Sequence, residues 1–157
     1  MPLSEGMIAP DFEFEDIDGE KKRISELKTK KVIFFYPKAD TRGCTQEACS
    51  FRDYYADIQR LGVQVIGVSM DQERDLEEFK RKNHLPYPLV SDQEGKIAEQ
   101  YGVRKKFLWI EMADRVTFLL DEENKILKVF HLGITGRKAR YGLNQHGKEV
   151  FEFLTNT

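Results

Sequence analysis

One short apolar run, closed by a proline, sets the strongest limit on the fold of this chain. Residues Lys31–Tyr36 precede Pro37, and a short apolar run without alternating polar positions is typical of a central strand buried on both faces. After a short loop, apolar residues recur at helical spacing, at Ala48, Phe51, Tyr55, Ile58 and Leu61. The order of buried strand, loop and amphipathic helix predicts one unit of a parallel α/β sheet.

The remaining segments alternate between predicted strands and helices. A hairpin signal, Asp18-Gly19, separates residues 12–15 from 21–24, and Ser25 is suited to cap one helical turn. Further strands are predicted over 63–70, 87–90, 116–120 and 125–131, and further helices over 72–83 (capped by Asp71), around 97–101 and over 143–154. We therefore predict an α/β fold, a thioredoxin-like three-layer sandwich with a mixed central sheet and an N-terminal β-hairpin.

Residues 104–113 fit neither the helical nor the strand period, and we assign no regular element to them. Their basic start, Arg104-Lys105-Lys106, is more typical of solvated surface than of a docking site. Trp109 and its apolar neighbours favour core packing over a place at the rim of an active site or in a dimer contact; these neighbours are Phe107, Leu108 and Ile110.

Size and composition favour one globular domain. A chain of 157 residues is long enough for one hydrophobic core, so we expect a single domain over residues 1–157. The 25 basic and 27 acidic residues give a formal charge of -2, which favours neither nucleic acid nor a membrane surface. No segment approaches the ~20 apolar residues of a membrane span, and residues 1–6 lack the features of a secretion signal. Because two cysteines are too few for a disulfide scaffold, we predict a cytoplasmic protein with reduced or redox-cycling thiols.

Cys44 lies where the helix after the buried strand begins. A thiol reacts as its thiolate, and the free N–H groups and dipole of a helix N-terminus lower the pKa of a nearby thiol. We therefore predict that this sulfur is ionised at neutral pH and suited to attack an O–O bond, with sulfenic acid as the product. The other interpretation is a small buried hydrophobe, as free cysteines often are. The strand–loop–helix context favours the reactive thiol.

The neighbours of Cys44 suit the same chemistry. Thr41 can offer its hydroxyl to the sulfur or to a bound oxygen, and Pro37 fixes the loop and shields the sulfur from water. Arg42 adds positive charge if its side chain points inward. Glu47 is interpreted as a carboxylate that complements the helix dipole rather than as a catalytic group.

Cys49, five residues after Cys44, cannot reach it while the helix is intact. In a continuous α-helix the two Cα atoms are roughly 8.5 Å apart, beyond the ~7 Å limit for a disulfide. Any bridge between them therefore requires the first turn or more to unwind, with Gly43 able to absorb the backbone change. The alternative is that Cys49 is a core residue on the apolar face of the helix.

No pattern predicts a metal ion or another cofactor. His84, His131 and His146 are scattered and share no ligand spacing with a cysteine. No GxGxxG, P-loop or HExxH motif occurs.

The motif around Cys44 resembles the active site of the peroxiredoxins. Pro37-x-x-x-Thr41-x-x-Cys44 is similar to the peroxiredoxin signature, and the stretch from Tyr36 to Cys49 resembles the bacterioferritin-comigratory-protein/PrxQ subfamily. The resemblance extends over nearly the whole chain, through Ala9-Pro10-Asp11-Phe12, Phe51-Arg52-Asp53, Val65–Ser69, Leu89–Asp92 and Arg115–Asp121.

The resemblance implies a role for each matching residue. Cys44 would be the peroxidatic cysteine, Thr41 would bind the peroxide, Pro37 would shape the pocket, and Arg115 would polarise the peroxide. Cys49 would be the resolving cysteine that forms an intramolecular disulfide. A thioredoxin-like or glutaredoxin-like donor would reduce the disulfide, and the subfamily favours a monomer or weak dimer.

The chain departs from the subfamily at one position of the motif, where Arg42 replaces the usual proline. The leading hypothesis is a thiol-dependent peroxidase that reduces hydrogen peroxide and organic hydroperoxides. One alternative is a protein dithiol–disulfide oxidoreductase, although that class normally uses CxxC spacing. The other is a redox-sensing interaction protein that uses sulfenic acid formation as a switch.

Overall fold

Five strands form the central sheet, in the order β5-β4-β3-β8-β9. The computed structural model describes residues 2–156, without the side chain of Phe107. At the centre, β3 (Lys30–Phe35) runs parallel to β4 (Val63–Ser69) and antiparallel to β8 (Val116–Leu120). The edge strands are β5 (Leu89–Ser91), parallel to β4, and β9 (Ile126–His131), antiparallel to β8. The predicted mixed sheet is therefore confirmed.

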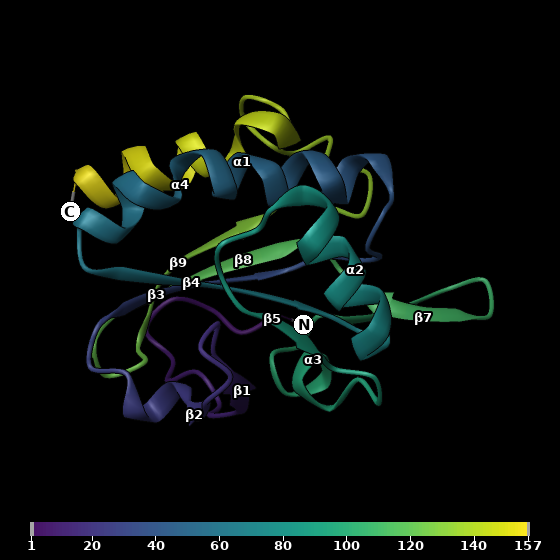
Figure 1. Ribbon diagram of the computed structural model, residues 1–157, viewed down its shortest axis with the longest axis horizontal. Helices are drawn as coiled ribbons and strands as arrows, with labels where there is room; N and C mark the ends of the chain where they lie inside the picture. The colour runs from purple at the N-terminus through teal and green to yellow at the C-terminus, as the bar shows by residue number, and fades with distance from the viewer. Residues whose placement is uncertain (1, 157) are drawn as a thin grey trace.

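Helices cover both faces of this sheet, because alternate side chains of its strands point to opposite sides. One face packs against α1 (Arg42–Arg60), α2 (Glu73–Asn83) and α4 (His146–Thr155), and Figure 1 shows α1 and α4 side by side above the strands. The other face packs against α3 (Lys96–Gln100) and the N-terminal segment. The predicted three-layer sandwich is confirmed.

The N-terminal hairpin forms as predicted, but the turn after it begins elsewhere. Strands β1 (Glu13–Glu15) and β2 (Lys21–Arg23) pair antiparallel, followed by the 3-10 turn η1 (Ile24–Glu26). Ser25 does not cap this turn; its hydroxyl donates to the Asp11 carboxylate at 2.9 Å. The prediction of a Ser25 cap is wrong because the turn begins at Ile24 with Arg23 as its N-cap, which leaves Ser25 inside the turn.

Asp71 serves the loop before α1 and not α2, whose N-cap is Gln72. The Asp71 carboxylate accepts hydrogen bonds from the Ala39 backbone N–H and from the Ser69 hydroxyl, each at 2.8 Å. The prediction of an Asp71 cap is wrong. The same carboxylate instead ties the loop after β3 to the end of β4, which fixes the approach to α1.

A hairpin occupies the segment to which the sequence pattern assigned no element. Strands β6 (Arg104–Phe107) and β7 (Ile110–Ala113) pair antiparallel and project from the body of the molecule (Figure 1). Leu108, Trp109 and Ile110 are 67%, 81% and 54% exposed, so the prediction of core packing is wrong for these side chains. A last turn, η2 (Leu143–Gln145), precedes α4. Within residues 2–156, no helix has the length and apolar character needed to cross a membrane.

Candidate active site

The Cys44 side chain lies in the first turn of α1 and is only 1% exposed. Thr41 is the N-cap residue, and Arg42 is the first residue of the helix. The helix therefore begins earlier than the apolar spacing indicated, since Arg42 and Gly43 carry no apolar signal. This start places Cys44 among the free backbone N–H groups of the helix N-terminus.

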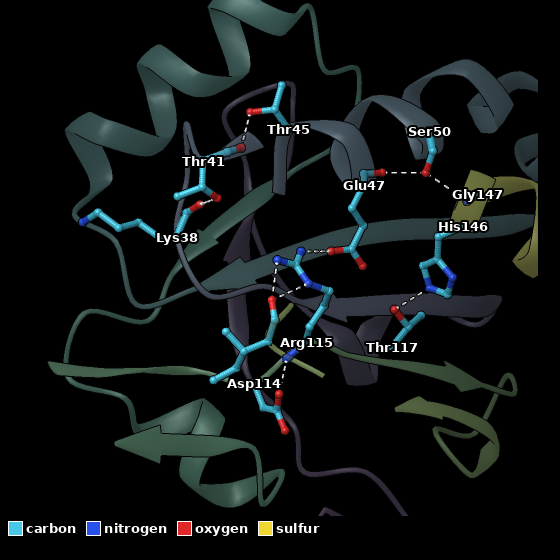
Figure 2. A network of polar contacts seen from close by, with 11 residues as sticks. Lys38, Thr41, Thr45, Glu47, Ser50, Asp114, Arg115, Thr117, His146 and Gly147 are labelled. Carbon is cyan, nitrogen blue, oxygen red and sulfur yellow. Dashed lines mark hydrogen bonds and ion pairs between the residues drawn. The ribbon is translucent and has the colours of Figure 1, made fainter. Parts of the chain in front are cut away.

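The loop between β3 and α1 is held by several polar contacts around buried Pro37. The Thr41 hydroxyl donates to the Lys38 carbonyl at 2.8 Å, and the Thr45 hydroxyl donates to the Thr41 carbonyl at 2.7 Å (Figure 2). Together with the contact from Ala39 to Asp71, these bonds hold Thr41 beside the first turn of α1.

Arg115 reaches the site because β8 runs antiparallel to β3. The pairing of Phe35 with Val116 brings the start of β8 beside the end of β3. Nη1 of Arg115 donates to Oε1 of Glu47 at 2.7 Å, and Nη2 donates to the Ile134 carbonyl at 3.0 Å (Figure 2). Both charged side chains are buried, with 4% of Arg115 and none of Glu47 exposed.

The Arg115 guanidinium also contacts the first turn of α1. A Cβ atom built at Gly43 would lie 3.0 Å from Cδ1 of Leu143 and 3.2 Å from Nη2 of Arg115, so a larger residue there would press on both side chains. Arg115 also interacts electrostatically with the Cys44 side chain. The structure thus brings Pro37, Thr41, Cys44 and Arg115 together, whereas the Arg42 side chain is exposed and does not point inward.

Burial raises the pKa of the Cys44 thiol above its ordinary value. The Arg115 charge lowers this pKa, as do the nearby Thr41 side chain and Lys38 backbone, whereas the Glu47 carboxylate raises it further. The lowered pKa predicted from helix position alone is wrong for this closed state, because the desolvation of a nearly inaccessible sulfur disfavours its charged form.

Glu47 anchors Arg115, a role that the sequence pattern missed. Burial raises the pKa of the Glu47 carboxyl, while the charges of His146 and Arg115 lower it. Its second oxygen, Oε2, is buried and has no hydrogen-bond partner within the described residues. The only signal for this role was the position of Glu47 one helical turn after Cys44, since Arg115 lies 68 residues away in sequence.

Cys49 lies on the same continuous helix as Cys44, and both thiols are free. Cys49 is partly buried, and its Sγ is 3.8 Å from Oδ1 of Asn83 at the end of α2. Burial raises the pKa of the Cys49 thiol. Since α1 is unbroken from 42 to 60, the helical geometry that separates the two sulfurs is present in this structure.

A cluster behind the site joins α1, α4 and β8. The buried His146 ring lies 2.9 Å from the Thr117 hydroxyl and 3.0 Å from Oε1 of Glu149. The Gly147 N–H donates to the Ser50 hydroxyl at 2.9 Å (Figure 2). Ser50 directly follows Cys49, so this cluster fixes α1 immediately after its two cysteines.

The arrangement supplies a nucleophilic sulfur with a cation and hydrogen-bonding groups beside it. It contains no group of three or more His, Cys, Asp or Glu side chains placed to hold a metal ion, among the residues that the structure describes. Such a site can hold an oxygen atom close to the sulfur and stabilise negative charge that develops on it.

Both the sequence and the fold of this chain match known proteins. A family model described as AhpC/TSA matches residues 6–129. Putative peroxiredoxin bcp of Coxiella burnetii is 44% identical over 138 residues, 83% of this chain and 89% of that protein. Peroxiredoxin Bcp of Escherichia coli K12 is 39% identical over 134 residues, 82% of this chain and 86% of that protein. The crystal structure of peroxidoxin BcpB from Mycobacterium tuberculosis aligns with a TM-score of 0.84 and 32% identity, covering 98% of this chain and 97% of that one.

Proposed function

The chain belongs to the AhpC/TSA family as an enzyme of the peroxiredoxin class, and we propose that it reduces hydrogen peroxide and organic hydroperoxides through Cys44. One observation carries the proposal: the Arg115 guanidinium is paired with Glu47 at 2.7 Å and lies beside the first turn of α1, where it interacts electrostatically with Cys44. A fixed cation beside a sulfur stabilises the thiolate and any negative charge on an oxygen next to it.

In the first step, the Cys44 thiolate attacks one oxygen of the hydroperoxide. A sulfur–oxygen bond forms, the O–O bond breaks, and the second oxygen leaves as an alcohol or water after taking up a proton. The sulfur is oxidised to sulfenic acid while the peroxide is reduced. Arg115 stabilises charge on the oxygens, and Thr41, whose proton is given to Lys38, keeps oxygen lone pairs to accept from the peroxide O–H.

In the second step, the Cys49 thiolate attacks the sulfenic sulfur. A disulfide forms and the hydroxyl leaves as water after protonation. Because 44 and 49 lie on one continuous helix, the first turns of α1 unwind before the two sulfurs meet. A thioredoxin-like or glutaredoxin-like dithiol then reduces the bridge and restores both thiols.

Stopped-flow measurement of peroxide consumption tests the assignment of the two thiols. We expect Cys44→Ser to abolish rapid consumption and Cys49→Ser to react once and accumulate sulfenic acid, detectable by mass spectrometry. Wild-type protein treated with one equivalent of peroxide should lose two hydrogens per chain as the bridge forms. Full turnover by Cys44→Ser would disprove the proposal, and faster reduction of insulin disulfides than of peroxide would favour the dithiol oxidoreductase.

A further inference from the structure

The tip of the β6–β7 hairpin exposes three adjacent apolar side chains. Leu108, Trp109 and Ile110 are each more than half exposed at the end of a projecting element (Figure 1). Leu108 also has a φ of 58°, in the left-handed region that favours glycine. The strained backbone and exposed side chain of Leu108 do not stabilise its own chain. Residues of this kind cluster at functional sites.

The flank of this tip is basic. Lys105 and Lys106 are exposed. Arg104 is already paired, since its Nη2 lies 2.7 Å from the Glu111 carboxylate and its Nη1 lies 3.4 Å from Glu99. The hairpin therefore presents an apolar tip with two exposed lysines beside it.

A concave site whose charge is opposite to that of the hairpin lies between β1, α2 and the edge strand β5. Its volume is about 390 Å³, within the range of sites that enclose small molecules and larger than an indole ring needs. Apolar side chains contribute to its lining, among them Phe14, Leu76 and Leu89. We call it the β1–α2 pocket.

The charged lining of the β1–α2 pocket is mostly acidic. Five carboxylates line it, against two lysines (Lys21 and Lys80). Asp16 is already paired with Lys22 at 2.7 Å. The other four carboxylates belong to exposed residues on β1 and α2: Glu13, Glu15, Glu73 and Glu77. A basic apolar tip suits this pocket in both charge and polarity.

We propose that the hairpin tip of one chain docks into the β1–α2 pocket of a second copy of this chain. Trp109 would enter the apolar floor while Lys105 and Lys106 meet the carboxylates of the rim. The tip does not line the pocket of its own chain and stands exposed, so the pairing of these two surfaces joins two copies. Because the contact is small, the association is weak and depends on concentration and on salt. The proposal is independent of the chemistry at Cys44.

Trp109 is the only tryptophan, so its fluorescence reports on the contact directly. Over a range from about 1 to 500 µM protein, we expect its emission to shift to shorter wavelength while sedimentation velocity shows a rising mass. Emission and mass that do not change with concentration would overturn the proposal. A shift seen only with vesicles of anionic phospholipid would also overturn it, in favour of a membrane surface.

Charge reversal tests the pairing itself. We expect the hairpin variant Lys105→Glu/Lys106→Glu and the pocket variant Glu13→Lys/Glu77→Lys each to weaken self-association at least about tenfold. All four positions are exposed, so both variants should keep the wild-type circular dichroism spectrum. An equimolar mixture should regain association, because the acidic hairpin of one variant meets the basic pocket of the other. A mixture that stays as weak as its components would refute the pairing of these two surfaces.

Discussion

At the scale of single residues, the candidate site depends on one buried pair of opposite charges. Glu47 and Arg115 lie 2.7 Å apart with almost no exposure to solvent. A buried ion pair is a poor source of stability, because the loss of hydration offsets much of the attraction between the charges. We interpret this pair as a device that holds the guanidinium against Cys44, since the Ile134 carbonyl fixes Arg115 from a second direction.

Glu47 affects Cys44 in two ways: its charge raises the pKa of the thiol, and its carboxylate holds Arg115 in place. Removing the charge of Glu47 separates these two effects. We expect Glu47→Gln to lower the pKa of the Cys44 thiol, because the carboxylate raises that pKa. We also expect peroxide reduction to slow by about tenfold or more, because Arg115 loses its anchor and catalytic geometry is sensitive to small displacements. The pH dependence of thiol alkylation measures the first effect, and stopped-flow kinetics the second. Exposed Glu78→Gln is the control, and a rate equal to that of the wild type would contradict the anchoring role.

The rate of sulfenic acid formation should increase with pH through the neutral range. Only the thiolate attacks, and burial raises the pKa of Cys44, so the rate should rise by up to about tenfold per pH unit well below that pKa. Arg115→Met removes the charge that favours the thiolate, and its profile should lie at higher pH; Arg115→Lys keeps the charge and should shift less. Stopped-flow kinetics from about pH 5 to 10 measures these profiles. A wild-type rate that is already constant below about pH 6 would show that Arg115 and the helix N-terminus outweigh burial.

The sequence predicted those site residues that are close together in the chain. Pro37, Thr41 and Cys44 share one loop and one helical turn, so local spacing was enough to place them. Arg115 came only from the family resemblance, since nothing local distinguishes a basic residue before a strand. The roles of Glu47 and His146 depend on partners that are brought together by the sheet and by α4, and no local pattern carries that information.

At the scale of elements, the proposed disulfide divides α1 into a first part that would have to move and a second part that α4 holds. The two cysteines lie near its start, and Ser50, directly after Cys49, is bonded to Gly147 of α4. At Gly147, an added Cβ would lie 2.3 Å from the Ser50 carbonyl oxygen, so the two helix backbones approach as closely as glycine permits. This contact sets the place where unwinding of α1 should stop.

The substitution Gly147→Ala tests the close approach of α1 and α4. The new methyl group would overlap the Ser50 backbone, so the helices must separate, and we expect the free energy of unfolding to fall by about 1–3 kcal/mol. Urea unfolding followed by circular dichroism measures the change. Lys148→Ala, at an exposed position next in sequence, should stay within about 0.5 kcal/mol of the wild type. Equal stability of both variants would show that the contact relaxes without loss.

Strongly periodic elements were predicted well, whereas elements set by tertiary contacts were not. Strands β3, β4 and β8 carry continuous apolar runs and lie where the pattern placed them. The β6–β7 hairpin has an apolar tip in place of the usual turn residues, and Leu108 rather than glycine takes the positive φ, so no turn signal was present. Asp71 does not cap α2, because its carboxylate accepts a hydrogen bond from the N–H of Ala39, 32 residues earlier in the chain.

At the scale of the whole molecule, the central sheet carries a helix whose first turns would open in the proposed reaction. Cys44 lies just past the end of β3, the central strand, which pairs with neighbours on both sides. We therefore expect oxidation to change α1 locally and to leave the sheet intact.

Hydrogen exchange before and after one equivalent of peroxide measures the extent of this opening. We expect amides 45–49 to lose protection when the disulfide forms, because Thr45 is the first residue whose N–H is bonded within the helix, while β3, β4 and β8 keep theirs. Cys49→Ser, which cannot form the bridge, should keep α1 protected after the same treatment. Retained protection over 45–49, together with an intact 44–49 disulfide by mass spectrometry, would rule out the unwinding step.

The position of the single tryptophan determines what its fluorescence can report about this enzyme. Trp109 is 81% exposed at the end of a hairpin, so its fluorescence follows whatever touches that hairpin. Because Trp109 does not lie on α1, an optical assay of the proposed unwinding needs a second chromophore among residues 42–49. Tyr54 lies beyond this segment, in the part of α1 that packs on α4, with its ring 5.7 Å from that of Phe151.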